Sequence, residues 1–132
     1  LEQLTLTDPL TGLANRRAFT EHLAADAARA RRHGRPLALA MLDIDGFKAI
    51  NDRLGHAAGD RVLVELATRL GRLSRSFETV ARIGGEEFAW VLPDSDLAGA
   101  RAAAERARGA VAGSPVAGVG RVTISAGVAQ LR

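Results

Sequence analysis

The 132-residue sequence contains no cysteine and no tyrosine, and Lys48 is its only lysine. Without cysteine there is no disulfide framework, no thiolate metal site and no cysteine nucleophile. One tryptophan and four phenylalanines provide little for a base-stacking platform. No apolar run approaches the roughly 20 residues of a membrane span, and no signal peptide opens the chain. We therefore expect a cytoplasmic location and no contact of this domain with a membrane.

The composition is typical of a single globular domain. Hydrophobic residues make up 47% of the chain and charged residues 25%, which is enough apolar material for a core. The net charge of +3 and the pI of about 10.9 raise the question of a nucleic-acid partner. The arginines, however, are scattered among alanines along helical stretches and form no long basic run, as on solvated helix faces. We expect no nucleic-acid partner.

The hydrophobic pattern and the turn residues predict one α/β (α+β) domain with a mixed central sheet and helices packed around it. Asn15 is a suitable cap for a first helix, which Gly34 and Pro36 end. The later elements are predicted to be a strand over 37–43, a helix over 47–54, a helix opened by Gly59–Asp60, a hairpin with strands 79–83 and 88–92, a helix from 93–95 to about 111, and a strand over about 121–129.

The most informative segment is Gly84-Gly-Glu-Glu-Phe88, which lies between two short apolar runs. A glycine pair between strand-forming residues predicts a tight β-hairpin, because such a turn needs positive φ values that glycine reaches without strain. Glu86 and Glu87 then lie at the hairpin tip. Since apolar strands do not need acids there, the tip is a candidate site for a metal ion or a charged substrate. Taken alone, the glycine pair indicates only a turn.

A second group of acids follows the apolar strand over 37–43. Asp43 ends this strand and Asp45 follows it. Strand ends and hairpin tips are where such a sheet presents polar side chains, so we expect Asp43 and Glu86 to converge. Two carboxylates suit Mg²⁺, which leaves its other positions to water and substrate phosphates, and two such ions favour an in-line displacement at phosphorus. The alternative is that Asp43 and Asp45 only mark a strand end.

The Asp-Gly-Phe-Lys loop of residues 45–48 runs into a helix. A helix N-terminus offers unpaired N–H groups and a positive dipole end to phosphates; Gly46 lets the backbone come close, and Lys48 adds a positive charge. One turn further, Asn51 has a donor and an acceptor for a base edge, and Asp60 can accept from guanine. Alternatively, Asn51 belongs to a surface turn and Asp60 is a first-turn acid favoured by the helix dipole.

Together these segments resemble the GGDEF family, the diguanylate cyclases. Three blocks match the family in order, and Val122-Thr-Ile-Ser-Ala-Gly-Val128 is similar to its late strand. The three blocks are Asp8-Pro-Leu-Thr-Gly-Leu-Ala-Asn-Arg-Arg17, Asp43-Ile-Asp-Gly-Phe-Lys-Ala-Ile-Asn-Asp52 with Gly55-His56 and Gly59-Asp60, and Gly84-Gly-Glu-Glu-Phe88. The resemblance spans nearly the whole chain and rests on too many fixed positions for chance.

The resemblance implies a fold like the palm of nucleotidyl cyclases and polymerases. It implies that two GTP molecules condense to bis-(3′-5′)-cyclic dimeric GMP with release of two pyrophosphates. The cofactor would be Mg²⁺, with Mn²⁺ as the alternative ion. Asp43 and Glu86 would hold the metal with the main-chain carbonyl of Ile44. Glu87 takes the fourth signature position, where the family also needs an acid, and Glu86 at the third position makes this the GGEEF variant.

The resemblance also implies the contacts with substrate. Main-chain N–H groups of residues 45–48 would surround the phosphates with the Lys48 side chain alongside, and two further side chains would recognise guanine. The implied substrate-binding residues are Asp45, Gly46, Phe47, Lys48, Asn51 and Asp60.

Each domain would offer one half-site that binds one GTP, so the resemblance implies an antiparallel homodimer during catalysis. Control would come from an upstream sensory domain, and we expect residues 1–7 to be the end of the helix that joins it. Residues 8–132 would form the GGDEF domain. Because the family continues with a further helix and strand, we expect a domain that lacks these last two elements, with Lys48 as the main side-chain cation at the phosphates.

The family often carries a product-inhibition site, an Arg-x-x-Asp shortly before the hairpin. The matching positions are Arg75 and Glu78, and Arg106 falls where a second inhibitory arginine often lies. The longer glutamate moves the carboxylate outward, which predicts weak product inhibition. The alternative is that both arginines are solvated surface charges.

The leading interpretation is an active diguanylate cyclase, because the signature is intact. The alternative is a catalytically inactive module that binds GTP or cyclic dimeric GMP for signalling, which loss of C-terminal elements would favour. Formation of product from GTP and Mg²⁺ distinguishes the two.

Overall fold

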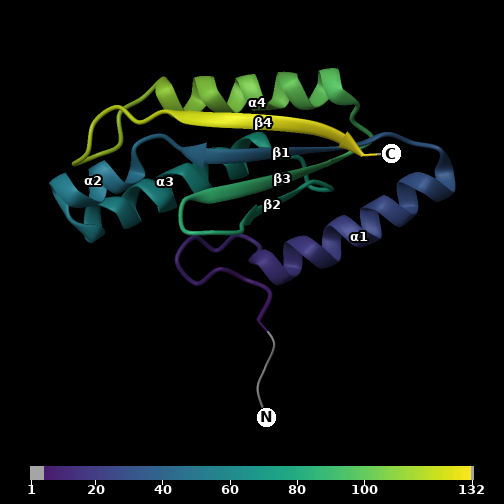
Figure 1. Cartoon of the computed structure of the whole chain (residues 1–132), viewed down its shortest axis with the longest axis horizontal. Coiled ribbons are helices and arrows are strands. Elements are labelled where there is room, and N and C mark those ends of the chain that lie inside the picture. Colours follow the sequence, from purple (N-terminus) through teal and green to yellow (C-terminus); the bar gives the residue numbers. More distant parts are fainter. Residues whose placement is uncertain (1–4, 132) are drawn as a thin grey trace, which may run out of the picture.

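The computed structural model describes residues 5–131, and this part of the chain contains four helices and four strands (Figure 1). In chain order they are α1 (Arg16–His33), β1 (Leu37–Ile44), α2 (Phe47–Leu54), α3 (His56–Leu73), β2 (Thr79–Arg82), β3 (Glu87–Pro93), α4 (Leu97–Ala112) and β4 (Ile124–Leu131). The predicted order of elements and the α+β class are confirmed. None of the helices within residues 5–131 is long and apolar enough to cross a membrane.

Only part of the expected linker helix over residues 1–7 can be compared with the structure. Residues 1–4 lie outside the described range. Residues 5–7 are not helical, and Thr7 forms an isolated β-bridge with Ala14. The segment before α1 therefore folds back on itself within the described residues.

The four strands form one sheet in the order β2-β3-β1-β4, and every neighbouring pair is antiparallel. The expected mixed sheet is therefore wrong for the described strands. Strands β1 and β2 run parallel, as do β3 and β4, but each of these pairs is joined through helices and separated by one strand. This is the split β-α-β arrangement, in which two interleaved units leave only antiparallel neighbours.

The main core lies between one face of the sheet and helices α3 and α4, with α4 lying along β4 (Figure 1). Alternate residues of β1 are buried in it, namely Ala38, Ala40, Leu42 and Ile44. Helix α1 contacts β1, β2 and β3, where Leu37, Ala89 and Val91 are buried outside this core cluster. Because side chains alternate along a strand, Asp43 lies on the face of Leu37.

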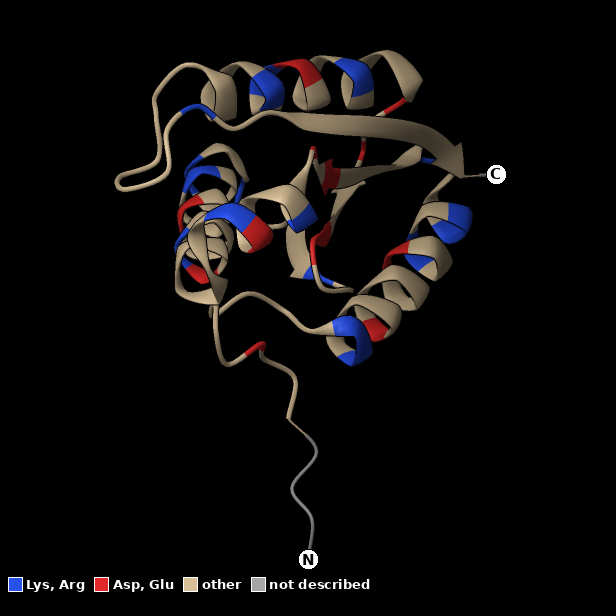
Figure 2. Cartoon of the chain, turned by 60° about the vertical axis from the view of Figure 1, so that its left-hand side comes forward, with Lys and Arg blue, Asp and Glu red and all other residues tan. Residues whose placement is uncertain are grey.

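Charged residues are spread over the helices. Basic residues occur on α1, on the α2–α3 region and on α4, and they lie next to acidic ones (Figure 2). Ion pairs within single helices, such as Glu65–Arg69 on α3 and Glu105–Arg108 on α4, account for part of this mixing.

The predicted start of α1 is confirmed. Asn15 is the N-cap, and its side chain accepts a hydrogen bond from the Ala18 N–H at 2.9 Å. Gly34 ends the helix with φ 65°, a left-handed conformation that favours glycine. Local capping chemistry thus fixes both ends of α1.

The predicted start of α3 is wrong. The helix begins at His56, because Gly55 with φ 91° is the single joint between α2 and α3. Asp60 is therefore the fifth helical residue and not a first-turn acid. Strand β4 likewise begins at Ile124, three positions later than expected, although Val122 is already buried.

Asp8 anchors the loop that precedes α1. Its carboxylate accepts hydrogen bonds from the Thr11 N–H at 2.9 Å and hydroxyl at 2.7 Å, and from Arg82 Nη1 at 3.2 Å. Burial alone raises the pKa of the Asp8 carboxyl, but the Thr11 hydrogen bonds and the Arg82 guanidinium outweigh burial and hold this pKa below its ordinary value. The fold therefore stabilises the ionised form of Asp8.

This arrangement predicts a pH-dependent contribution to stability. We expect Asp8→Asn to lower the free energy of unfolding at neutral pH by on the order of 1 kcal/mol. Because the pKa of Asp8 is lower in the folded state, the wild-type advantage is present above the ordinary value near 3.9 and is lost as pH falls through the lower folded value. Urea unfolding of both proteins at pH 7 and pH 3 measures this. The difference in free energy of unfolding between the two proteins should be smaller at pH 3 than at pH 7. An equal difference at both pH values would contradict the prediction.

Candidate active site

Residues 83–86 join β2 to β3 and form the tip of the signature hairpin. Neither Gly84 nor Gly85 adopts the expected positive φ, because the connection is longer than a two-residue turn. Gly84 instead allows a close approach: a Cβ at this position would lie 3.3 Å from Glu87 Oε1. The first signature glycine therefore leaves room for the Glu87 side chain.

Asp43 and Glu87 are direct partners across the antiparallel pair β1–β3. Both are exposed, and both line one shallow hollow together with Ser125 of β4. No ion pair within residues 5–131 includes either carboxylate. Since like charges directly opposite one another destabilise a strand pair, a cation at this position would relieve their repulsion.

Glu86 lies beside the same strand end. The Ile44 N–H donates to the Glu86 carbonyl at 3.3 Å, so the main chain of Glu86 meets the residue that follows Asp43. The Glu86 side chain is half-buried. The structure thus brings the expected metal-site residues to one end of the sheet, namely Asp43, Ile44, Glu86 and Glu87.

The chemistry of these donors fits Mg²⁺ or Mn²⁺. Both ions accept carboxylate and carbonyl oxygens, and Mg²⁺ needs only one or two carboxylates because water and substrate phosphates complete its octahedron. Within residues 5–131, no group of three or more His, Asp or Glu side chains is arranged to hold a metal ion.

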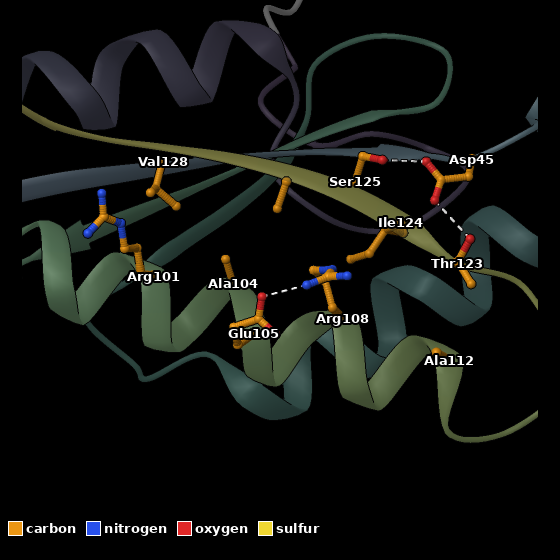
Figure 3. A pocket seen from close by; sticks show the side chains of 11 residues that line it. Asp45, Arg101, Ala104, Glu105, Arg108, Ala112, Thr123, Ile124, Ser125 and Val128 are labelled. Carbon is orange, nitrogen blue, oxygen red and sulfur yellow. Dashed lines mark hydrogen bonds and ion pairs between the residues drawn. The ribbon is translucent and has the colours of Figure 1, made fainter.

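Asp45 fastens the loop after β1 to β4 (Figure 3). Its carboxylate accepts from Ser125 Oγ at 2.6 Å and Thr123 Oγ1 at 2.8 Å, and its N–H donates to the Thr123 carbonyl at 3.0 Å. The Ser125 hydroxyl, followed by that of Thr123, holds the pKa of the Asp45 carboxyl below its ordinary value, and the charge of Arg108 adds to this. The expected contact of the Asp45 N–H with phosphate would require the hydrogen bond to Thr123 to break.

The rest of the predicted phosphate loop leads into α2. Gly46 is the N-cap of α2 and has φ 65°, which favours glycine. Phe47 packs against the core, whereas Lys48 is exposed and pairs with Asp52 one turn along the helix, with 2.8 Å between Nζ and Oδ2. An exposed pair of this kind contributes only about 0–1 kcal/mol, so Lys48 can exchange Asp52 for a phosphate at little cost.

Asn51 and Gly59 lie in contact where α2 packs against α3. A Cβ on Gly59 would lie 1.9 Å from Asn51 Oδ1 and 3.2 Å from Phe47 Cζ. Asn51 is half-buried, and Asp60, the neighbour of Gly59, is exposed. The glycine interior to α3 therefore lets the expected guanine-reading asparagine lie directly against that helix, next to the segment that carries Asp60.

Two of the three residues expected at an inhibitory site, Arg75 and Glu78, are in contact through the Arg75 main chain. Glu78 Oε1 accepts from the main-chain N–H of Arg75 at 2.8 Å and from the indole N–H of buried Trp90 at 3.1 Å. The Arg75 guanidinium forms no ion pair with Glu78 within residues 5–131, and Arg106 lies exposed on α4 without an ion pair. The Glu78 carboxylate therefore closes a turn and provides the acceptor for the indole N–H of Trp90.

Sequence reasoning missed a groove between α4 and β4, which encloses about 740 Å³ (Figure 3). Arg101, Glu105 and Arg108 line its α4 side, and it extends to Asp45; Arg106 is not among its lining residues. The helical spacing of the three α4 residues indicates a shared face. Nothing in the sequence places that face against β4.

The family model described as "Diguanylate cyclase, GGDEF domain" matches residues 5–132. The chain belongs to the GGDEF family. This GGDEF domain is 48% identical over 129 residues to the diguanylate cyclase DgcP of Pseudomonas aeruginosa. The match covers 96% of this chain but only 19% of DgcP, so the chain corresponds to about a fifth of that relative.

Solved structures of GGDEF domains share this fold. The GGDEF domain of DgcB from Caulobacter crescentus, solved in complex with c-di-GMP, is 36% identical with a TM-score of 0.92; the match covers 100% of this chain and 81% of that one. The active GGEEF domain of a diguanylate cyclase from Vibrio cholerae is 37% identical with a TM-score of 0.86, covering 91% of this chain and 78% of that one.

Proposed function

We propose that this domain is one half-site of a diguanylate cyclase. It binds one GTP, and two such domains condense two GTP molecules to bis-(3′-5′)-cyclic dimeric GMP and two pyrophosphates. The observation that carries the proposal is the pair of acids Asp43 and Glu87 on adjacent strands, with Glu86 beside them and the N-terminus of α2 following the same strand end. The active GGEEF domain from Vibrio cholerae supports a glutamate at the third signature position.

Asp43, Glu86 and the main-chain carbonyl of Ile44 are the groups that would hold Mg²⁺, with Mn²⁺ as the alternative. Bound there, the ion would polarise phosphate oxygens and offset charge on the leaving pyrophosphate. Glu87 contributes a further negative charge directly opposite Asp43. The cluster therefore favours a cation more strongly than one exposed acid would.

The triphosphate would lie at the N-terminus of α2. The first N–H groups of a helix have no partner within the helix and attract anions. The N–H of Asp45 already donates to the Thr123 carbonyl, so the proposed binding N–H groups begin at Gly46 and continue through Phe47 to Lys48. The Lys48 ammonium group, released from Asp52, would add the positive charge.

Guanine would be recognised between α2 and α3. The Asn51 amide offers both a donor and an acceptor, and the contact with Gly59 limits its orientations. The exposed Asp60 carboxylate can accept from the guanine imino and amino groups. An adenine ring offers no matching pair of donors at that edge, so these two residues would select GTP over ATP.

Two domains would meet with two-fold symmetry, because the product is itself two-fold symmetric. The 3′-hydroxyl of one GTP attacks the α-phosphate of the other in line, and pyrophosphate leaves from the opposite side. The hydroxyl proton passes to a general base or to water. Since each domain supplies half of the reacting atoms, the rate per domain should rise with protein concentration.

Incubation of the protein with GTP and Mg²⁺, followed by separation of the nucleotides, tests this function. We expect cyclic dimeric GMP and pyrophosphate, with a rate per domain that increases over a series of protein concentrations. If GTP is bound but stays unconverted at the highest protein concentration, the proposed cyclase activity is contradicted, and the domain is a nucleotide-binding module instead.

Binding of product at the Arg75 turn should be weak. The Glu78 carboxylate already accepts from Trp90 and from the Arg75 main chain, so a ligand must compete for it. We expect calorimetry with cyclic dimeric GMP to give no tight binding and Glu78→Gln to change the affinity by less than about threefold, because glutamine keeps the acceptor oxygen. If the wild type bound the product tightly and Glu78→Gln did not, the Glu78 carboxylate would instead be a direct contact of the product.

A further inference from the structure

Arg82 makes contacts in two directions at the last position of β2. Its Nε and Nη2 atoms donate to the Gly85 carbonyl at 3.1 and 3.0 Å, and its Nη1 atom donates to Asp8 Oδ1 at 3.2 Å. The side chains of Arg82 and Asp8 are only 19% and 15% exposed. One guanidinium therefore joins the loop before α1 to the tip of the signature hairpin.

The Asp8 end of this link is rigid. Besides the two hydrogen bonds from Thr11 to its carboxylate, the Asp8 carbonyl accepts from the Gly12 N–H at 2.9 Å and its N–H donates to the Leu13 carbonyl at 2.7 Å. Asp8 thus closes a compact turn with its main chain and side chain. Because the Asp8 carboxylate is fixed by this turn, the turn also fixes the position of the Arg82 guanidinium.

The hairpin end depends on outside support. Ile83 and Gly84 donate only to the Glu87 carbonyl, at 3.0 and 3.4 Å, and the long 3.3 Å bond from Ile44 to the Glu86 carbonyl is the link to β1. Two successive glycines give the tip wide conformational freedom. Contacts from Arg82 to the Gly85 carbonyl restrict the residue that directly precedes Glu86.

The same N-terminal segment touches the hairpin at two more positions. Arg16 Nη1 donates to the Ile83 carbonyl at 3.2 Å, and the Arg82 N–H donates to the Ala14 carbonyl at 2.9 Å. The segment of residues 8–16 therefore covers the free edge of β2 up to the base of the tip, and Arg82 is the link that reaches Gly85.

We propose that Arg82 is a positioning residue for the active site: by bridging Asp8 and the Gly85 carbonyl, it sets the orientation of Glu86 and Glu87. This inference rests on the function proposed above. It also makes the hairpin sensitive to the loop before α1, because any change that withdraws Asp8 removes one end of the bridge. A lysine cannot replace Arg82, since one ammonium group does not span both acceptors as the planar fork does.

The test compares Arg82→Lys with a matched control, Arg35→Lys. Arg35 forms an exposed 3.4 Å pair with Asp94, outside the hairpin. Without nucleotide, amide hydrogen exchange of residues 84–87 should become at least about tenfold faster in Arg82→Lys, while α3 amides stay as in the wild type. In steady-state assays kcat should fall by roughly 10–100-fold, with KM for GTP little changed because the α2–α3 contacts are intact. Arg35→Lys should match the wild type in both measurements.

Unchanged exchange at residues 84–87 in Arg82→Lys would overturn the proposal. Should Arg82→Lys lose its fold, the variant Asp8→Asn decides. It removes the charge and replaces one acceptor oxygen at the other end of the bridge with an NH2 donor. Faster exchange confined to residues 84–87 then supports the proposal, and unchanged exchange there overturns it. A wild-type protein that makes no cyclic dimeric GMP would refute the proposed function, whereas the exchange data would still decide what Arg82 does.

Discussion

Glu86→Gln is expected to reduce formation of cyclic dimeric GMP by on the order of 100-fold or more, because a metal ion that stabilises phosphoryl transfer is worth several kcal/mol and each 1.4 kcal/mol is tenfold in rate. Glutamine preserves the size of the side chain and removes only the charged ligand. Initial rates with Mg²⁺ and GTP, measured beside thermal unfolding curves, report both consequences. The melting temperature should stay close to that of the wild type, since no ion pair within residues 5–131 uses Glu86.

The matched control for this variant is Glu21→Gln. Glu21 is an exposed glutamate on α1, away from the hairpin, so its replacement should leave the rate unchanged. If Glu86→Gln retained the wild-type rate, the assignment of the third signature position to the metal would be withdrawn. If both variants were equally slow, the loss would come from net charge rather than from the site.

Gly59→Ala is the second variant with a large expected effect. Alanine inside a helix normally stabilises a protein by up to about 1 kcal/mol relative to glycine. Here the added Cβ would lie 1.9 Å from Asn51 Oδ1 and 2.9 Å from Asn51 Cγ, so α2 must shift or Asn51 must leave its position. We expect a net loss of about 1–3 kcal/mol in the free energy of unfolding. We also expect GTP affinity to fall by roughly tenfold or more, the loss of one good hydrogen-bonding group.

Gly71→Ala provides the comparison within the same helix. A Cβ on Gly71 meets no atom within 4 Å, so this variant should be neutral or slightly stabilised and should bind GTP normally. Denaturant unfolding and GTP calorimetry on the two variants separate helix propensity from the Asn51 contact. Equal behaviour of Gly59→Ala and Gly71→Ala would contradict the close packing of Asn51 against α3.

Much of the fold could be predicted from the sequence where local chemistry decides it. The Asn15 cap, the Gly34 stop and the short helix α2 follow from capping residues and hydrophobic spacing alone. Two errors have tertiary causes. Gly59 resembled a helix start because glycine is rare inside helices, yet it is required there by the side chain of Asn51. The strand directions depend on which strands become neighbours, which periodicity does not specify.

The acids of the candidate site could be found because each lies in a short contiguous motif, Asp43 in one and the two glutamates in another. Their supports could not, because the partners are far apart in sequence: Asp45 with Ser125, Glu78 with Trp90, and Arg82 with Asp8. A charged residue inside the apolar run over 79–83 is the signal that the sequence offers for Arg82. Its partner is set by the return of the N-terminal loop to β2, which only the folded chain shows.

The most direct measurement for the whole account is a crystal structure of the protein with Mg²⁺ and a non-reactive GTP analogue. We predict a metal ion bound by the carboxylates of Asp43 and Glu86, with the triphosphate at the N-terminus of α2 and the guanine near Asn51. An ion that binds the nucleotide without contacting either carboxylate, or a nucleotide bound elsewhere on the domain, would contradict it.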